Sequence, residues 1–259
     1  MITYPNCKIN LGLHVIGKRP DGYHDLETIF LPVHEMHDRL EIVAESQSRV
    51  AVMEQTGLVL DNAPEDNICL RAWQLMHDEY GVPPVRIRLE KTVPFGAGLG
   101  GGSSDAAFTL KMLNTMFSLG LGDVDLERLA ARIGADCAFF IKNKPAFATG
   151  IGDQLEPLEW KLESGNWKVV IEIPEGEHVS TKEAYGRLDL SGTSLPDLRE
   201  AVKRPISEWR HLIVNDFEKS VFAAHPAIAA LKDEMYRRGA LYASMTGSGA
   251  AVFGIFENK

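Results

Sequence analysis

The chain has 259 residues, of which 45% are apolar and 24% are charged, as in an ordinary globular protein. Its formal net charge of −9 argues against broad binding to nucleic acid or to an anionic membrane, because such binding needs a basic face. No apolar run approaches the ~20 residues that span a bilayer, and residues 1–6 lack the pattern of a secretory signal. We therefore expect a cytoplasmic protein with no nucleic-acid or membrane partner, and the sequence indicates no oligomeric state.

The cysteines also bear on the compartment. Cys7, Cys69 and Cys137 are odd in number and lie far apart in the sequence. This spacing predicts neither a disulfide framework nor a zinc site, and it is typical of proteins from a reducing compartment.

The first part of the chain mixes strand-like and helix-like segments. Strands are expected at 8–15, 26–33, 39–44 and 85–90, and a helix at 67–80. Residues 17–24, between the first two strands, form a turn-rich loop that ends in Tyr23 and His24. Residues 85–90 alternate strictly between apolar and polar side chains, which predicts a half-exposed strand.

A glycine-rich segment follows that strand. Five of the seven residues from 96 to 102 are glycine, and Ser103, Ser104 and Asp105 come next. Glycine lets the backbone turn tightly and approach a ligand closely, while these three polar residues are favoured N-caps for a helix expected at 106–117. Backbone N–H groups and the positive end of the helix dipole then face one spot, which suits a phosphate. The alternative, a tight turn with no ligand, needs fewer glycines.

Other phosphate-binding patterns do not fit this segment. The Walker sequence is absent, and the Gly-x-Gly-x-x-Gly pattern at 96–101 lacks the acidic residue that ends a second strand in a dinucleotide fold. The protein-kinase motifs are absent as well. The candidate phosphate-binding residues are Pro94, Phe95, Gly96, Ala97, Gly98, Leu99, Gly100, Gly101, Gly102, Ser103 and Ser104.

The rest of the chain indicates the fold class. Asp125 is expected to cap a helix at 126–133, which Gly134 ends. Further strands are expected at 146–149, 167–173, 241–245 and 250–256, and helices at 182–187, 195–204 and 227–238. The polar, loop-like segment 153–165 places a domain boundary near residue 158, which gives domains 1–158 and 159–259. Helices and antiparallel strands without regular βαβ alternation predict an α+β fold.

Several motifs resemble the GHMP kinases, the superfamily of galactokinase, homoserine kinase and mevalonate kinase. They are Lys-Ile-Asn-Leu at 8–11, the glycine-rich segment at 94–107 and Met-Thr-Gly-Ser-Gly-Ala at 245–250. Within the superfamily, the chain is similar to the family of 4-diphosphocytidyl-2-C-methyl-D-erythritol kinases. The narrowing motifs are Gly-Lys-Arg-Pro-Asp-Gly-Tyr-His at 17–24, Gly-Ala-Asp at 134–136, Phe-Phe at 139–140, Ala-Thr-Gly-Ile-Gly at 148–152 and Val-Ser-Thr at 179–181.

This resemblance implies a two-domain GHMP-kinase-like architecture with the active site in the interdomain cleft. It also implies ATP-dependent phosphorylation of the 2-hydroxyl of a cytidine-diphosphate-linked methylerythritol, in the non-mevalonate route to isoprenoids. ATP is then the cofactor, and Mg²⁺ is expected with it because the ion bridges phosphate oxygens and needs few protein ligands. The sequence names no metal ligand.

Lys91, just before the glycine-rich segment, is a further candidate. It reaches the phosphates or the ribose of ATP, or it is an exposed strand lysine.

Two charged residues are the catalytic candidates. Asp136 follows a predicted helix end. The sequence alone favours a surface aspartate at this position, whereas the resemblance makes it the catalytic aspartate. Lys8 lies in an apolar strand, so it is either an edge residue or the partner of a buried carboxylate. The resemblance selects the second reading, with Asp136 as that partner. The ammonium would orient the aspartate and offset charge on the transferring phosphoryl group.

The substrate-binding candidates are Asn10, Tyr23, His24, Thr181 and Tyr185. Asn10 shares a strand face with Lys8 and is expected to hold a substrate hydroxyl, the alternative being a solvent-facing polar residue. By resemblance Tyr23 and His24 hold the cytosine. Tyr185 is expected to supply a second stacking face, or else to be a core aromatic residue.

Two other functions compete with this one. A GHMP kinase acting on an isoprenoid or sugar precursor without cytidine would have no need of Tyr23 and His24. A catalytically silent sensor of nucleotide or sugar would have no need of Lys8 and Asp136 together. Fold analogy alone does not decide between them.

Overall fold

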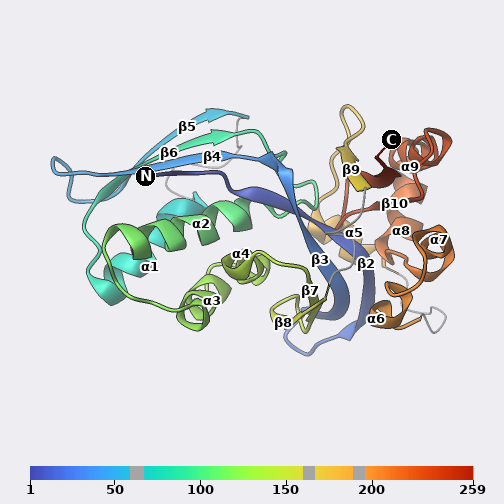
Figure 1. The fold of residues 1–259 in the computed structure, drawn as a ribbon, viewed down its shortest axis with the longest axis horizontal. Coiled ribbons are helices and arrows are strands. Elements are labelled where there is room, and N and C mark those ends of the chain that lie inside the picture. The colour runs from blue at the N-terminus through green and yellow to red at the C-terminus, as the bar shows by residue number, and fades with distance from the viewer. Residues whose placement is uncertain (59–66, 160–166, 189–195, 259) are drawn as a thin grey trace. The chain divides into compact units, whose positions relative to one another are not determined.

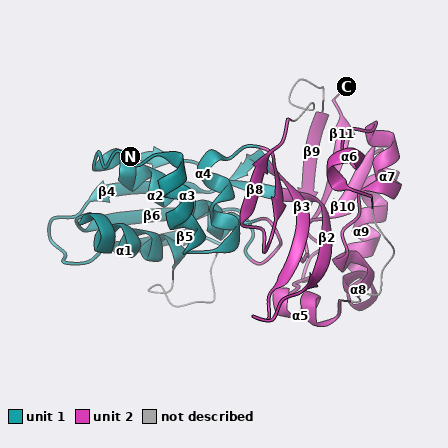
Figure 2. Cartoon of the chain, turned by 90° about the horizontal axis from the view of Figure 1, so that it is seen from below, with its two compact units in different colours: residues 1–8, 32–95, 100–144 teal, residues 9–31, 96–99, 145–259 magenta. Residues whose placement is uncertain are grey.

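The computed structural model describes residues 1–58, 67–159, 167–188 and 196–258. It forms two compact units, each built from segments that are distant in the sequence (Figure 2). Unit 1 contains residues 1–8, 32–95 and 100–144, and unit 2 contains residues 9–31, 96–99 and 145–259. Two long strands, β2 (Asn6–Lys18) and β3 (His24–His37), each contribute residues to both units.

These compact units differ from the continuous domains 1–158 and 159–259. The chain changes unit within β2, within β3 and twice within the glycine-rich segment. Local sequence patterns report whether a segment is a strand or a helix, but they do not report which distant segments it packs with. A functional domain boundary near residue 158 stays a prediction.

Unit 1 is a four-stranded sheet with helices on one face (Figure 1). The strands lie in the order β1-β4-β6-β5, with β5 parallel to β6 and the other pairs antiparallel. The strands are β1 (Ile2–Thr3), β4 (Arg39–Ala44), β5 (Val52–Gly57) and β6 (Val85–Lys91). The helices are α1 (Ile68–Tyr80), α2 (Gly101–Met116), α3 (Asp123–Ala131), the 3-10 helix η2 (Ala135–Cys137) and α4 (Phe139–Lys142).

The register of this sheet explains its core. Leu40 lies opposite Leu89 and Ile42 opposite Ile87, and all four side chains are buried. Successive residues of a strand point to opposite faces, so the apolar alternation of β6 turns one face toward the helices. Helix α2 covers that face with a buried stripe that includes Leu110 and Leu113.

Unit 2 contains two sheets and several short helices. One sheet has the order β2-β3-β7-β8, and the other is antiparallel in the order β10-β11-β9. The strands of this unit alone are β7 (Ala146–Thr149), β8 (Gln154–Pro157), β9 (Trp167–Glu172), β10 (Tyr242–Met245) and β11 (Val252–Glu257). The helices are α5 (Thr181–Gly186), α6 (Leu198–Ala201), the 3-10 helix η4 (Ile206–Glu208), α7 (Trp209–Leu212), α8 (Phe217–Ala224) and α9 (Pro226–Arg237). Phe217, Ile228 and Met235 join Met245 and Val252 in one core cluster.

The expected α+β class is confirmed, and most expected elements are present within one to three residues of their predicted ends. Several elements were missed, including the short β1, α4 and α7. Strand β5 was not predicted, β8 lies in the segment read as a loop, and α8 was not recognised. β5 and β8 are mostly exposed, so their sequences show little of the apolar alternation that marks a buried strand. The expected helix at 195–204 is shorter, and residue 195 lies outside the described residues.

The expected helix caps were wrong. Helix α2 begins at Gly101, so Ser103, Ser104 and Asp105 lie inside it. Helix α3 begins at Asp123, which places Asp125 in its first turn rather than at its cap. Gly134 has φ −173°, an extended conformation, and α3 already ends at Ala131. Cap preferences describe side chains that bond to backbone donors, but the N-caps of α2 and α3 are Gly100 and Gly122, and no side chain makes such a bond there. Among the described helices, none is long and apolar enough to cross a membrane.

Candidate active site

Lys8 and Asp136 form an ion pair in unit 1. Lys8 Nζ lies 3.5 Å from Asp136 Oδ2, and the two side chains are 4% and 33% exposed. β2 carries the lysine, while η2 carries the aspartate on a tight connection between α3 and α4. Burial lowers the pKa of Lys8, and Asp136 opposes that shift. The pair therefore joins a buried cation to a partly exposed carboxylate, so the carboxylate can reach a bound molecule.

The start of α2 lies beside this pair. Gly100, the N-cap of α2, has φ +68°, and its side-chain position would lie 3.1 Å from Cγ and Cε of Lys8. No side chain caps the helix at this position, and the first backbone N–H groups of an α-helix have no intrahelical partner. An uncapped helix N-terminus next to a buried ammonium is a suitable place for an anion.

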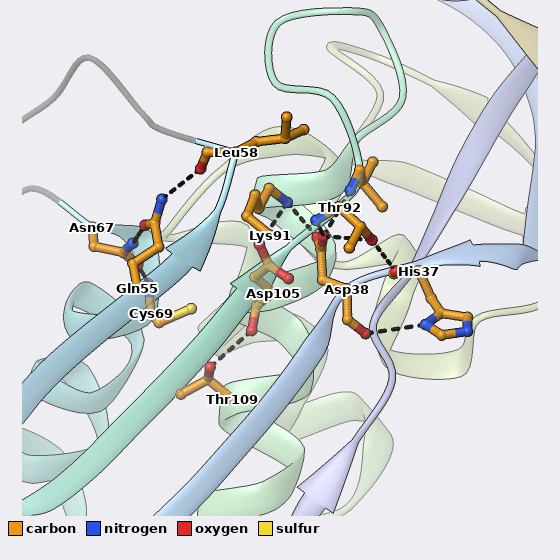
Figure 3. A network of polar contacts seen from close by, with 11 residues as sticks. His37, Asp38, Gln55, Leu58, Asn67, Cys69, Lys91, Thr92, Asp105 and Thr109 are labelled. Atoms are coloured by element: carbon orange, nitrogen blue, oxygen red, sulfur yellow. Dashed lines mark hydrogen bonds and ion pairs between the residues drawn. The ribbon is translucent and has the colours of Figure 1, made fainter.

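The Lys91 side chain is buried, so the alternative of an exposed strand lysine does not apply. It is 1% exposed, and its Nζ donates to Oδ2 of Asp105 at 2.9 Å and to Asp38. Figure 3 shows the side chains of Asp38 and Asp105 on either side of the Lys91 ammonium. Lys91 therefore belongs to a buried ion cluster and does not make the direct contact with the phosphates that was one of its expected roles.

In unit 2, part of the glycine-rich segment packs against the turn after β10. Thr246 Oγ1 donates to the carbonyl of Gly98 at 3.1 Å, and the N–H of Ala251 donates to the carbonyl of Ala97 at 3.2 Å. Gly98 has φ +77°, and a Cβ on it would lie 2.1 Å from the carbonyl oxygen of Thr246. Glycine is therefore required at this position, because both the conformation and the space exclude a side chain.

Asn10 belongs to the same polar group. Its Nδ2 donates to Thr28 Oγ1 at 3.0 Å, and its backbone N–H donates to Thr246 Oγ1 at 2.9 Å. The residue is 3% exposed, so the solvent-facing alternative for Asn10 does not apply. Thr181, the first residue of α5, places its hydroxyl 3.3 Å from that of Ser248 in the turn after β10. The sequence motifs at 8–11, 94–104, 179–181 and 245–250 thus meet one another within their units.

The aromatic candidates lie in unit 2 as well. His24 stacks on Tyr185 with ring centroids 4.6 Å apart and 25° between the planes, and Tyr185 meets Phe217 edge to face. Because the His24 and Tyr185 rings touch, a base does not fit between them in this conformation. Tyr23 is 61% exposed, which leaves its ring available to a ligand. Tyr185 serves as a stacking residue and as a core aromatic residue at once.

Metal binding needs a separate test. The described residues contain no group of three or more His, Cys, Asp or Glu side chains that could hold a metal ion. Ser104 is buried, and in the part of the chain that the structure describes its hydroxyl has no hydrogen-bond partner. An oxygen of this kind near a helix N-terminus fits a phosphate-bound Mg²⁺, which takes few protein ligands.

Unit 2 also holds a cavity of about 930 Å³ lined by Trp167, Arg199, Pro205, Ile206 and Trp209, among others. None of its lining residues is a predicted site residue. Arg199 at its wall pairs with Asp197, so the cavity offers no unpaired charge from this arginine to a ligand.

Comparison with known proteins gives the family. The model of the GHMP kinases N terminal domain matches residues 67–144, and that of the GHMP kinases C terminal domain matches residues 195–259. A 4-diphosphocytidyl-2-C-methyl-D-erythritol kinase of Bacteroides fragilis is 49% identical over 260 residues, which cover 99% of this chain and 92% of that protein. One of Cytophaga hutchinsonii is 45% identical over 259 residues, covering 100% and 93%.

The chain belongs to the 4-diphosphocytidyl-2-C-methyl-D-erythritol kinase family of the GHMP kinases. A crystal structure of a 4-(cytidine 5'-diphospho)-2C-methyl-D-erythritol kinase is 32% identical and superposes with a TM-score of 0.81, covering 98% of this chain and 89% of that one. A homoserine kinase of Cytophaga hutchinsonii, 17% identical with a TM-score of 0.68 over 98% of this chain and 85% of its own, shares the fold. The family resemblance drawn from the motifs is thus confirmed.

A substitution at Gly102 can test whether the start of α2 binds the phosphates of ATP. This glycine has no positive φ, and a Cβ there would come no nearer than 3.9 Å to Ile68. Valine has a higher helix propensity than glycine, so Gly102→Val should leave the melting temperature unchanged or raise it. We expect the KM for ATP to rise strongly, because the side chain would occupy space that a phosphate needs. A melting shift with unaltered KM would favour a turn that binds no ligand.

The pH dependence of kcat can test whether catalysis needs the charged form of Lys8 in the Lys8–Asp136 ion pair. Because burial lowers the pKa of Lys8 below its ordinary value of 10.5, the lysine should lose its proton at a lower pH than an exposed lysine. We expect kcat to fall on the alkaline side below pH 10.5, and Lys8→Arg to move that fall to higher pH because arginine stays charged. An alkaline limb that is the same in both proteins would show that Lys8 does not cause it.

Proposed function

We propose that the protein is an ATP-dependent kinase that phosphorylates the 2-hydroxyl of 4-diphosphocytidyl-2-C-methyl-D-erythritol. The observation that carries this proposal is the Lys8–Asp136 ion pair beside the uncapped start of α2. A base for a hydroxyl and a place for a phosphate then lie together, as phosphoryl transfer to an alcohol requires. The names of the relatives support the same substrate.

Asp136 is proposed as the general base. Its carboxylate is partly exposed, whereas Lys8 is buried behind it, so the lysine orients the carboxylate and leaves it open to the substrate hydroxyl. The proton of that hydroxyl would pass to Asp136 as the oxygen bonds to the γ-phosphorus, and the bond from that phosphorus to ADP breaks. Lys8 would offset the negative charge of the transferring group.

ATP is proposed to bind with its phosphates at the first turn of α2. The backbone donors of residues 101–103 and the dipole of a helix that extends to Met116 favour the anion. Mg²⁺ is proposed to arrive with ATP, with the hydroxyl of Ser104 as a suitable neighbour. When bound, the ion would neutralise charge on the phosphate oxygens.

Tyr23 and His24 are proposed to recognise the cytosine. The backbone turn before them is fixed, since the N–H of Arg19 donates to the carbonyl of Tyr23 at 2.8 Å and Asp21 accepts from the N–H of Tyr23. His24 is held in place by its stack on Tyr185. The base would therefore stack on the exposed Tyr23 ring, while His24 contacts its edge. Asn10 and Thr181 are proposed to contact the rest of the substrate.

The protein is proposed to act in the cytoplasm. Cys7, Cys69 and Cys137 are free and buried, and burial raises the pKa of Cys7 and of Cys137 to about 12. Such thiols are inert packing residues, and a chain that keeps them unpaired suits a reducing compartment.

The competing functions lead to different assays. ADP release should be seen with the cytidine-containing substrate and not with mevalonate or galactose. Turnover of mevalonate or galactose in place of the cytidine compound would favour the alternative kinase. Binding of ATP with no turnover of any of them would favour a sensor.

Asp136→Asn tests the base. The amide keeps the shape but accepts no proton, so kcat should fall about 10²- to 10⁴-fold while ATP affinity stays unchanged. Asp125→Asn, which neutralises an exposed carboxylate of the same unit, serves as the control and should keep full activity. Near-normal kcat for Asp136→Asn would exclude Asp136 as the base.

A uridine analogue of the substrate tests base recognition. Cytosine has an amino donor where uracil has a carbonyl, and a mismatched buried polar group costs about 1–3 kcal/mol, or roughly 5- to 150-fold in kcat/KM. We expect the enzyme to prefer the cytidine compound by that factor. His24→Ala should narrow the preference, whereas Tyr185→Phe retains the stacked ring and should preserve it. Equal kcat/KM for the two compounds with the unmodified enzyme would exclude recognition of the base edge.

A further inference from the structure

A buried ion cluster in unit 1 has no role in the chemistry proposed above. Lys91, Asp38 and Asp105 are 1%, 0% and 1% exposed. They come from three elements: Lys91 ends β6, Asp105 lies in the second turn of α2, and Asp38 lies between β3 and β4. Lys91 Nζ donates to both carboxylates, so a single ammonium connects the other two residues (Figure 3).

The cluster touches both ends of the glycine-rich segment. Oδ1 of Asp38 accepts from the backbone N–H of Thr92 at 2.6 Å and from that of Val93 at 2.8 Å, the two residues that lead into the segment. Asp105 lies in α2 just after the last glycines and serines of the segment, and it bonds to the same Lys91 Nζ at 2.9 Å. A Cβ on Gly101 would lie 3.0 Å from that Nζ, so the ammonium is in close contact with the first residue of α2.

Stability alone is a poor explanation for such a cluster. Removing charges from water is costly, and apolar side chains of similar volume often give equal or greater stability. Burial raises the pKa of Asp105 to about 8 in spite of the nearby Lys91. Burial therefore disfavours the charged form of this carboxyl, and the bond to Lys91 offsets only part of that cost. What the cluster provides over apolar packing is a fixed direction for each hydrogen bond.

The segment between the two ends needs such fixing. Gly96, Gly98 and Gly100 have φ of +67°, +77° and +68°. Glycine loses more conformational freedom on ordering than any other residue, and a loop that is ordered before its ligand arrives binds that ligand more tightly. An anchor at each end reduces the number of conformations open to the free protein.

We propose that Lys91, Asp38 and Asp105 are positioning residues that hold the glycine-rich segment and the start of α2 in the conformation that binds the phosphates of ATP. This inference rests on the proposed function, because it assumes that ATP binds there. The cluster acts through the backbone and touches neither substrate nor the transferred group. Its loss should therefore weaken ATP binding and leave kcat at saturating ATP nearly unchanged.

Two substitutions at Asp105 distinguish the loss of its hydrogen bond to Lys91 from other effects of changing the residue. Asp105→Ala removes the acceptor of Lys91 Nζ, whereas Asp105→Asn keeps an oxygen acceptor in the same place. The other oxygen, Oδ1, has no hydrogen-bond partner within the described residues, so the amide nitrogen of asparagine displaces no contact there. Loss of a buried partner costs about 1–3 kcal/mol. We expect the Kd for ATP, measured by calorimetry with Mg²⁺, to rise about tenfold in Asp105→Ala and to stay within about twofold in Asp105→Asn.

The matched control lies at the other end of the same helix. Asn114 bonds through its side chain to the backbone N–H and carbonyl of Leu121, both at 3.0 Å. Asn114→Ala should lower the melting temperature without changing the Kd for ATP. Hydrogen–deuterium exchange of residues 92–104 without nucleotide should be faster in Asp105→Ala and unchanged in Asn114→Ala. If Asp105→Ala does not fold, Asp105→Leu fills the volume and removes the same acceptor.

The outcomes are distinct. Failure of the unmodified protein to bind ATP would overturn the proposed function itself. Normal ATP binding by the unmodified protein, with the same Kd and exchange in Asp105→Ala as in Asn114→Ala, would overturn only the positioning role. A Kd raised equally in Asp105→Asn and Asp105→Ala would show that the bond to Lys91 is not what matters, which also contradicts the proposal.

Discussion

The start of α2 imposes the constraint on which the rest of the site depends. Its first backbone N–H groups have no partner within the helix, and Gly100, in a left-handed conformation, supplies no side chain to cap them. Unsatisfied donors of this kind are costly away from water, so an anion from outside the protein is their natural partner. Three groups are arranged around this one helix end: the buried Lys8 beside Gly100, the carboxylate of Asp136 next to it, and the hydroxyl of Ser104, which has no hydrogen-bond partner among the described residues.

Much of the fold was predictable because its strongest signals are local. The alternation in residues 85–90 predicted β6. A lysine inside an apolar strand left two possibilities for Lys8, an edge residue or the partner of a carboxylate. The family resemblance selected the second with Asp136 as the partner, and the 3.5 Å contact bears out that pairing. The alternation in β6, continued by two residues from Leu89, places Lys91 on the buried face, so its burial could also have been inferred. Its partners could not, since Asp38 and Asp105 lie 53 and 14 residues away and no local pattern pairs them.

The failures share a physical cause. Ser103, Ser104 and Asp105 are good N-cap residues in isolation, yet the helix starts at Gly101, and the Asp105 carboxylate bonds to the distant Lys91 and caps no backbone N–H. The contact between His24 and Tyr185 joins residues 161 positions apart, and their order in the chain does not show whether the two rings touch or enclose a ligand. Local preference sets the kind of element, whereas contacts between distant segments set its limits and its partners.

The order of strands in the sheet of unit 2 bears on how the protein can be divided. β11 is the central strand, with β10 on one side and β9 on the other, and six residue pairs join β11 to β9. The part that matches the GHMP kinases C terminal domain begins at residue 195 and so leaves β9 out. A fragment cut there would expose one whole edge of a buried, apolar strand, which is a ready template for pairing with other chains. Recombinant fragments should therefore keep residues 167–172 if they are to stay free of aggregation.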